Sequence, residues 1–148
     1  MKTHHLIFFF FFVFFIQSCK DKKGITIFHP SHEPSRVNVP YSDAVETEDF
    51  LFLTGQIGRD HKLGKLVDGG IEAETKQVIE NIQDVLKYHG LSLDHVVKCT
   101  VILKNIEDFQ KFNAVYTQYF TKKPARTTYA AAGLAGGASI EIDVIAAK

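Results

Sequence analysis

The feature that most constrains the fold is a one-sided apolar stripe along residues 71–89. Its members recur at steps of three and four residues, and Glu, Lys, Gln and Asp occupy the opposite side. The stripe consists of Ile71, Val78, Ile79, Ile82, Val85 and Leu86. Gly90 follows, where a left-handed glycine commonly ends a helix. The segment is therefore predicted to be an amphipathic helix with one face packed on a core.

A second amphipathic helix is predicted to begin near Asn105 and to end before Pro124. Asn105 is a favourable N-cap residue, and Asp108 three residues later makes an imperfect capping box. The apolar side carries Ile106, Phe109, Phe112, Val115, Tyr116, Tyr119 and Phe120. Asn113 is polar within this aromatic surface, and the residues alone favour a structural amide there.

Strands are predicted around these helices, where β-branched and apolar residues are concentrated or alternate with polar ones. Residues 50–57 are so densely apolar that we expect burial on both faces for much of their length. Residues 96–103 form another strand. The order strands, helix, strand, helix, strands predicts an α+β fold with a mixed β-sheet and two helices packed on one face. Since the other sheet face also carries apolar residues, a homo-oligomer is expected to cover it.

The last quarter of the chain carries the candidate chemistry. Arg126 and Thr128 share one face of a predicted strand, and Glu141 lies on the polar face of the next. Residues 133–137 are rich in glycine and predict a hairpin-like connection that brings Arg126 and Thr128 near Glu141. A guanidinium, a hydroxyl and a carboxylate on one sheet face suit a small carboxylate-bearing substrate. The alternative is a solvated face with a surface ion pair.

The N-terminal segment is predicted to be a lipoprotein signal peptide covering residues 1–18. Its unbroken apolar run, residues 6–16, is short for a membrane span, and Ser18-Cys19 resembles the end of a bacterial lipobox. Residues 19–24 then form a polar tether, and residues 25–148 one folded domain. We therefore expect an exported bacterial lipoprotein anchored in a membrane through lipid on Cys19. An ordinary signal peptide or an uncleaved anchor is the alternative.

Side chains that form disulfides or bind metals are few. If Cys19 carries lipid, Cys99 is left alone, and its apolar strand neighbours indicate a small buried hydrophobe. His29, His32 and Glu33 suggest a metal site, but without another well-spaced strong ligand no metal is predicted.

The charge balance argues against a nucleic-acid partner. The chain has 17 Lys and Arg and 17 Asp and Glu residues, and removal of Lys2 with the signal leaves one net negative charge. No basic run is interleaved with aromatic residues, as backbone-tracking proteins require. We therefore expect no nucleic-acid partner.

Six short motifs occur in order along the chain. They are Pro40-Tyr41-Ser42, Leu53-Thr54-Gly55-Gln56-Ile57, Gly69-Gly70-Ile71-Glu72-Ala73, Phe112-Asn113-Ala114-Val115-Tyr116, Pro124-Ala125-Arg126-Thr127 and Ile140-Glu141-Ile142. Together they resemble the RidA/YjgF-like reactive-intermediate deaminase family, and the resemblance covers essentially all of residues 25–147. The resemblance implies a chorismate-mutase-like homotrimer with clefts between subunits. It also implies hydrolysis of 2-imino acids, such as 2-iminobutanoate and 2-iminopropanoate, to 2-keto acids and ammonia without cofactor or metal.

The resemblance assigns roles to particular positions. Arg126 is expected to hold the substrate carboxylate, and Glu141 to help place the attacking water. The cleft is expected to be lined by Tyr41, Thr54, Gly55 and Asn113, with Thr128 beside the arginine.

This chain departs from the family pattern in several places. The usual serine is Thr54, a frequent cysteine is Thr128, and a proline is replaced by Gly58. Further departures are Val39 in place of a glycine and Ala135 within a usual Arg-Leu-Pro segment. They concern the cleft rim, so they affect substrate choice more than chemistry.

Two alternatives remain: a non-catalytic trimer that binds small carboxylates, and a chaperone-like or ribonuclease activity. This last alternative is disfavoured because the sequence predicts neither a basic surface nor a paired-histidine site.

Overall fold

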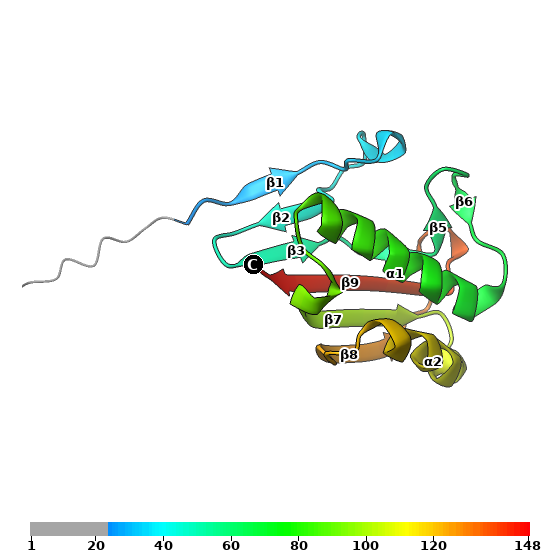
Figure 1. The fold of residues 1–148 in the computed structure, drawn as a ribbon. Helices are drawn as coiled ribbons and strands as arrows, with labels where there is room; N and C mark the ends of the chain where they lie inside the picture. Colours follow the sequence, from blue (N-terminus) through cyan, green and yellow to red (C-terminus); the bar gives the residue numbers. More distant parts are fainter. Residues whose placement is uncertain (1–23) are drawn as a thin grey trace, which may run out of the picture.

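The computed structural model describes residues 24–148 and contains one large mixed sheet (Figure 1). Its strand order is β1-β2-β3-β9-β7-β8, and β4 also pairs with β9. The strands are β1 (Ile27–His29), β2 (Ala44–Glu46), β3 (Phe50–Leu53), β4 (Gln56–Ile57), β7 (Val96–Leu103), β8 (Ala125–Ala130) and β9 (Ile140–Ala147). A separate hairpin, β5 (Arg59–Asp60) with β6 (Lys65–Leu66), follows β4. The predicted signal peptide and Cys19 lie outside the described residues.

The first predicted helix is confirmed as α1 (Gly70–Tyr88). Gly90 has a φ of 74° and ends it as expected. The Gly90 N–H donates to the Lys87 carbonyl at 3.0 Å, and the Leu91 N–H to the Leu86 carbonyl at 2.8 Å. These two bonds form a Schellman motif, which satisfies carbonyl groups that would otherwise lack intrahelical partners.

The second predicted helix is α2 (Phe109–Tyr119), preceded by a 3₁₀ turn at Ile106–Asp108. The predicted capping box is wrong. The Asn105 side chain makes no cap hydrogen bond within the described part of the chain; instead, the Asp108 N–H donates to the Asn105 carbonyl at 3.2 Å. The backbone therefore closes the first turn by itself, and the start of the helix is tightened into 3₁₀ geometry.

Both helices cover the same face of the sheet, and the core lies between the two layers (Figure 1). Alternate residues of the central strands point into this core. They are Leu51, Leu53, Cys99, Val101, Leu103, Ile140, Ile142, Val144 and Ala146. Each large aliphatic side chain buried there contributes about 1.5–3 kcal/mol. The predicted α+β fold with two helices on one face of a mixed sheet is confirmed.

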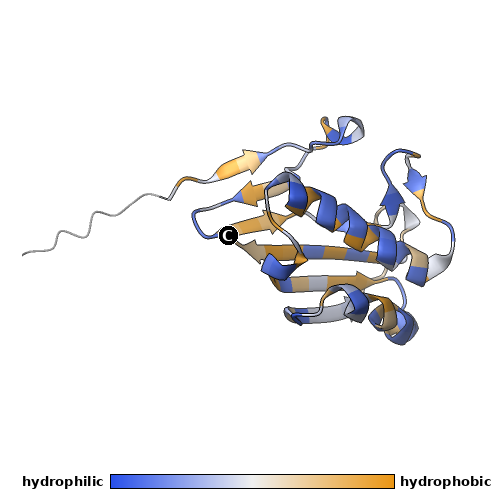
Figure 2. Cartoon of the chain, in the orientation of Figure 1, coloured by the Kyte–Doolittle hydropathy of each residue, from blue (hydrophilic) through white to orange (hydrophobic). Residues whose placement is uncertain are grey.

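The other face of the sheet is open within residues 24–148, and this corrects the expectation for residues 50–57. In β3, Leu51 and Leu53 are buried, but Phe50 and Phe52 remain 39% and 40% exposed. The helices cover only one side of the strand, so its apolar density did not indicate two-sided burial. Figure 2 shows how apolar residues dominate the central strands while the outer side of α1 is hydrophilic. Among the described residues, no helix is long and apolar enough to cross a membrane.

The predicted hairpin between the last two strands is wrong. β8 pairs in parallel with β7, and β9 pairs antiparallel with the other edge of β7. The longest apolar stripe of the C-terminal segment is in β9, where alternate residues are fully buried, so this strand occupies the sheet centre. β8 has no fully buried residue and takes the edge. Burial, rather than closeness in the chain, thus decides the strand neighbours.

Candidate functional site

Arg126 lies on the helix-covered face of β8, where α2 fixes its orientation. One guanidinium nitrogen, Nη2, donates to Asn113 Oδ1 at 2.9 Å. The guanidinium carbon lies 4.5 Å from the ring centroid of Tyr116 and 5.1 Å from that of Phe112. Stacking on aromatic rings suits a planar cation and restricts its rotamers. The Arg126 side chain is therefore oriented before any ligand arrives.

A pocket of about 350 Å³ opens beside this arginine. It is lined by Asn113, Tyr116, Thr117, Phe120, Lys123, Pro124 and Arg126. Thr128 follows two residues later on the same strand face, and its buried Oγ1 has no hydrogen-bond partner among residues 24–148. Two cationic side chains with neighbouring polar groups suit a small anion such as a carboxylate. Arg126, Asn113 and Thr128 are together called the Arg126 group below.

Glu141 belongs to a second group on β9 and the end of β3. Gly55 lies so close to it that a Cβ built on Gly55 would overlap Glu141 Oε1. Only glycine permits this approach without displacing the carboxylate. Burial raises the pKa of Glu141, and the charge of Asp143 raises it further. The carboxylate is therefore a better proton acceptor than an ordinary exposed glutamate.

Tyr41 and Gly55 line a pocket of about 290 Å³ near this carboxylate. Tyr41 is 50% exposed, and the half-buried Thr54 donates its backbone N–H to the Asp43 carbonyl at 3.0 Å. We call Tyr41, Thr54, Gly55 and Glu141 the Glu141 group. The structure thus divides the predicted site residues into two groups of near neighbours.

Supporting residues of the Glu141 group were missed by sequence reasoning. Asp43 is almost completely buried and pairs with Arg36, whose Nη2 lies 2.7 Å from Asp43 Oδ1. Arg36 also donates to the buried Gln56 Oε1 at 3.2 Å. This network ties the segment before β2 to β4. Gln56 stands in one of the motifs above, but Arg36 and Asp43 are distant from it in the sequence, and no local pattern identifies them.

Glu74 of α1 anchors the start of β9, close to Glu141. Its carboxylate accepts the Ser139 backbone N–H at 2.8 Å and the Ser139 hydroxyl at 2.6 Å. A Cβ on Gly58 would lie 2.7 Å from Glu74 Cα, so Gly58 allows α1 to approach closely. A sequence signal did exist, because Glu74 stands three residues after Ile71 on the apolar stripe of the helix.

The Arg126 and Glu141 groups do not form one site within a single chain. Arg126 pairs with Cys99 in the sheet register, and Glu141 pairs with Ile102 of the same strand, β7. Because Cys99 faces the helices and Ile102 the open face, the two charged side chains lie on opposite faces of the sheet. The prediction that Arg126 and Thr128 lie beside Glu141 on one face is therefore wrong for the isolated chain.

Cys99 is buried, as predicted, and accepts a hydrogen bond from the Tyr116 hydroxyl at 3.3 Å. Burial raises the pKa of its thiol to about 11. At neutral pH the thiolate, which is the nucleophilic form, is therefore scarce. Cys99 packs as a core residue.

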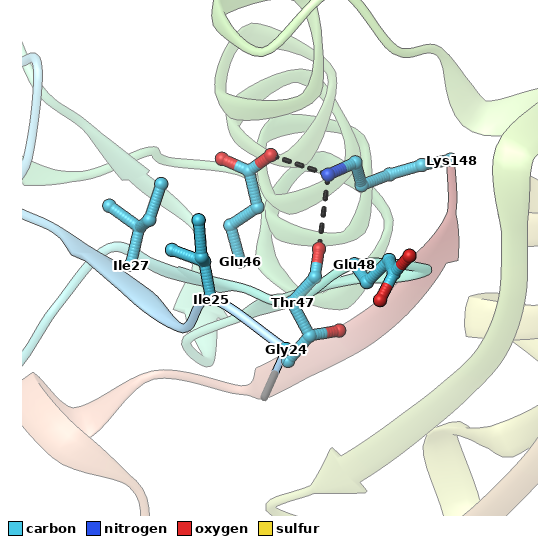
Figure 3. Close-up of a pocket in the computed structure, with 7 residues that line it drawn as sticks. All are labelled: Gly24, Ile25, Ile27, Glu46, Thr47, Glu48 and Lys148. Carbon is cyan, nitrogen blue, oxygen red and sulfur yellow. Dashed lines mark hydrogen bonds and ion pairs between the residues drawn. The ribbon is translucent and has the colours of Figure 1, made fainter. Parts of the chain in front are cut away.

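Two further features lie away from both groups. A pocket of about 510 Å³ is lined by Gly24, Ile25, Ile27, Glu46, Thr47, Glu48 and Lys148 (Figure 3). Nearby, the rings of His29 and His89 have centroids 4.5 Å apart. The expectation that the chain has no paired histidines is therefore wrong: the pair joins residues 60 positions apart in the numbering, which no local spacing reveals.

Comparisons with known proteins agree with the motifs. The sequence profile described as endoribonuclease L-PSP matches residues 31–148. A human protein named 2-iminobutanoate/2-iminopropanoate deaminase is 44% identical over 108 residues, covering 72% of this chain and 79% of the relative. A RutC family protein of Pyrococcus horikoshii is 46% identical over 110 residues, covering 74% and 87%. A crystal structure from Thermotoga maritima superposes with a TM-score of 0.77 at 40% identity, covering 82% of this chain and 97% of that one.

Proposed function

The chain belongs to the endoribonuclease L-PSP family, which includes RidA, and on that premise we propose that it hydrolyses reactive 2-imino acids to 2-keto acids and ammonia. The observation that carries the proposal is the preoriented Arg126 guanidinium, because an imino acid needs a carboxylate clamp. Relatives carry the deaminase name, but others are named only as RutC family proteins. The reaction and its substrate class are therefore proposed for this chain.

Arg126 holds the carboxylate of the imino acid in this proposal. Nη2 donates to Asn113, and the planar guanidinium has further N–H groups for the two carboxylate oxygens. Such a clamp fixes the neighbouring imine carbon relative to the protein. The buried Thr128 hydroxyl is available for a further hydrogen bond to the ligand.

Glu141 orients the water and accepts its proton. The water oxygen bonds to the imine carbon, and the C=N electron pair takes up the proton held by Glu141, giving a carbon that bears both a hydroxyl and an amine. The hydroxyl proton then passes to the amine nitrogen as the C–N bond breaks, so the hydroxyl becomes the keto oxygen and ammonia leaves. Water, imino acid, keto acid and ammonia balance without a redox partner. The raised pKa of Glu141 favours this proton transfer.

Assembly of the two groups requires a second copy of the chain. We propose a homotrimer in which the Arg126 group of one subunit faces the Glu141 group of its neighbour. The exposed aromatic side chains Phe50, Phe52 and Tyr129 on the open sheet face provide apolar surface for subunit contact. Opposite faces of one sheet can then contribute to the same cleft.

Mixed trimers test the shared site directly. Arg126→Lys and Glu141→Gln chains are co-expressed with different affinity tags, and trimers containing both are isolated. Each mixed ring has one subunit pair in which both groups are intact, so activity should recover to about one-third of the wild-type rate. The two parent trimers serve as controls. Mixed trimers no faster than their parents would reject the shared site.

The main alternative is a trimer that binds small carboxylates without turnover. It is distinguished by titrating wild-type protein with 2-ketobutyrate beside an assay of 2-iminobutanoate hydrolysis. Tight, Arg126-dependent binding without rate enhancement would select the binding protein over the enzyme. Hydrolysis lost in both single variants would select the deaminase.

We also propose that the protein is anchored in a membrane by lipid on Cys19, which lies outside the described residues. Expression in a bacterial host should give a membrane-bound chain that begins at an acylated Cys19, as detected by intact mass. Cys19→Ala should remove the acyl mass. Cleavage at another bond would reject the anchor.

A further inference from the structure

Three potential metal ligands converge at one edge of the molecule, away from both groups of the proposed site. They are His29 on β1, Glu46 on β2 and His89 at the C-terminal end of α1. One ligand atom from each lies within 4.8 Å of the others. His29 Nε2 is 2.8 Å from Glu46 Oε2, and all three residues are half-buried.

Regular structure holds each of these side chains in place. β1 and β2 pair antiparallel, with Ile27 opposite Glu46 and His29 opposite Ala44, so His29 and Glu46 are diagonal neighbours across the pair. His89 is the C-cap of α1, within the Schellman turn described above. The last carbonyls of a helix carry partial negative charge, which also favours a nearby cation.

A second interaction orients the carboxylate of Glu46. Lys148 Nζ lies 2.6 Å from Glu46 Oε1 and 3.0 Å from the Thr47 carbonyl oxygen. Figure 3 shows that the other Glu46 oxygen points away from Lys148. That oxygen, Oε2, is the one beside His29. Outer partners of this kind fix the ligands of metal sites.

We propose that His29, Glu46 and His89 bind one zinc-class divalent metal ion, with water in the fourth position. Two imidazoles and one carboxylate are a known zinc ligand set, with metal–ligand distances of about 2.0–2.2 Å. Tetrahedral bonds of that length place ligand atoms about 3.3–3.6 Å apart, between the 2.8 Å pair and the 4.8 Å limit observed here. Small side-chain movements therefore complete the site.

The bound ion joins the edge strand β1 to β2 and to the end of α1. β1 has only three residues, and Ile27 and Phe28 are 45% and 67% exposed, so few apolar contacts hold it. The metal ion thus cross-links β1, the strand that follows the N-terminal segment, to the rest of the domain. This role is independent of the proposed deaminase chemistry.

The test measures Zn²⁺ binding to the full-length chain, purified in detergent and freed of metal. Wild type should bind one Zn²⁺ per chain and unfold at a higher temperature when Zn²⁺ is added. His89→Ala and Glu46→Gln should each weaken binding by more than about 10-fold, since even outer-shell changes cost this much. His32→Ala is the matched control: this histidine stacks on Tyr88 beside the cluster, but it is not one of the three ligands.

Co²⁺ provides an independent spectroscopic readout of the same site. Its visible absorption should report a four-coordinate site in wild type and in His32→Ala, and the bands should be lost in His89→Ala. Zn²⁺ affinity that is the same in wild type, His89→Ala and Glu46→Gln would show that the ion binds elsewhere and overturn the proposal. A wild type that binds no stoichiometric Zn²⁺ would overturn it as well, leaving His29, Glu46 and Lys148 as an ion-pair cluster only.

Discussion

The Arg126 group and the Glu141 group each contain one charged side chain, of opposite sign, and the fold supports the two in different ways. Arg126 is on an edge strand and has its partners in the same chain: an amide and aromatic rings of α2. Glu141 is on the central strand β9, facing the open side of the sheet beside Gly55 and Asp143. The Arg126 guanidinium thus has its supporting partners in one chain, while the Glu141 carboxylate is half-buried beside a second acidic residue, Asp143, which raises its pKa.

This difference suggests how the proposed reaction is divided. A guanidinium that is already stacked and hydrogen-bonded loses little freedom when it binds a carboxylate. A carboxylate whose pKa is raised by burial holds its charge at a cost, and this makes it a stronger base. The comparison therefore assigns binding to the Arg126 group and proton transfer to the Glu141 group, and mutations should separate the two.

The largest effect is expected for Glu141→Gln, which keeps the shape but removes the proton acceptor. Turnover, kcat, should fall about 100-fold or more, whereas KM should change little. Steady-state kinetics with 2-iminobutanoate generated in situ measures both constants. An equal loss in binding of 2-ketobutyrate would contradict the division of roles, because Glu141 would then hold the ligand as well.

Arg126→Lys should lower kcat/KM by roughly 30-fold or more, which corresponds to about 2–5 kcal/mol. Lysine keeps the charge but cannot donate in parallel to both carboxylate oxygens while stacked on Tyr116. Binding of 2-ketobutyrate, measured by calorimetry, should weaken in parallel. Full retention of that affinity in Arg126→Lys would show that the carboxylate binds elsewhere.

The close packing of Gly58 on Glu74, which supports the Glu141 group, should be measurable as a change in the stability of the folded protein. In Gly58→Ala the new methyl group overlaps Glu74, so α1 must shift and the free energy of unfolding should fall by about 1–3 kcal/mol. Gly133→Ala is the matched control, since an added Cβ there has no neighbour within 4 Å among the described residues. Denaturant titration measures both. Equal stability in the two variants would mean that the Gly58–Glu74 contact relaxes without cost.

The smallest effect is a shift in pH dependence. The pKa of Glu141 is raised, so its basic form is lost as pH falls through that raised pKa, and activity should be lost with it. Asp143→Asn removes the charge that contributes to the shift and should move the acid limb of kcat/KM to lower pH. If the acid limb stays in place or moves to higher pH, the loss of activity at low pH is not caused by protonation of Glu141.

Several elements were predictable because their signals are local. The apolar stripe of residues 71–89 and Gly90 together define α1, since periodicity and a left-handed turn depend on neighbouring residues. The strand at residues 96–103 was also predicted, and it coincides with β7. The family was identifiable from short motifs in order, as the profile match over residues 31–148 confirms. The trimer, the residue roles and the anchor at Cys19 stay predictions.

Only the tertiary structure decided which strands are neighbours and which face each side chain takes. A period-two pattern shows that Arg126 and Thr128 share one face of a strand, but it does not show whether helices cover that face. β9 lies at the centre of the sheet, where its alternating apolar residues are buried. β7 therefore lies between β9, which carries Glu141, and β8, which carries Arg126. The cluster of His29, Glu46 and His89 likewise depends on tertiary structure, because it joins two strands to the end of α1. Such contacts join distant residues, and the free energy that selects them comes from burial across the whole core.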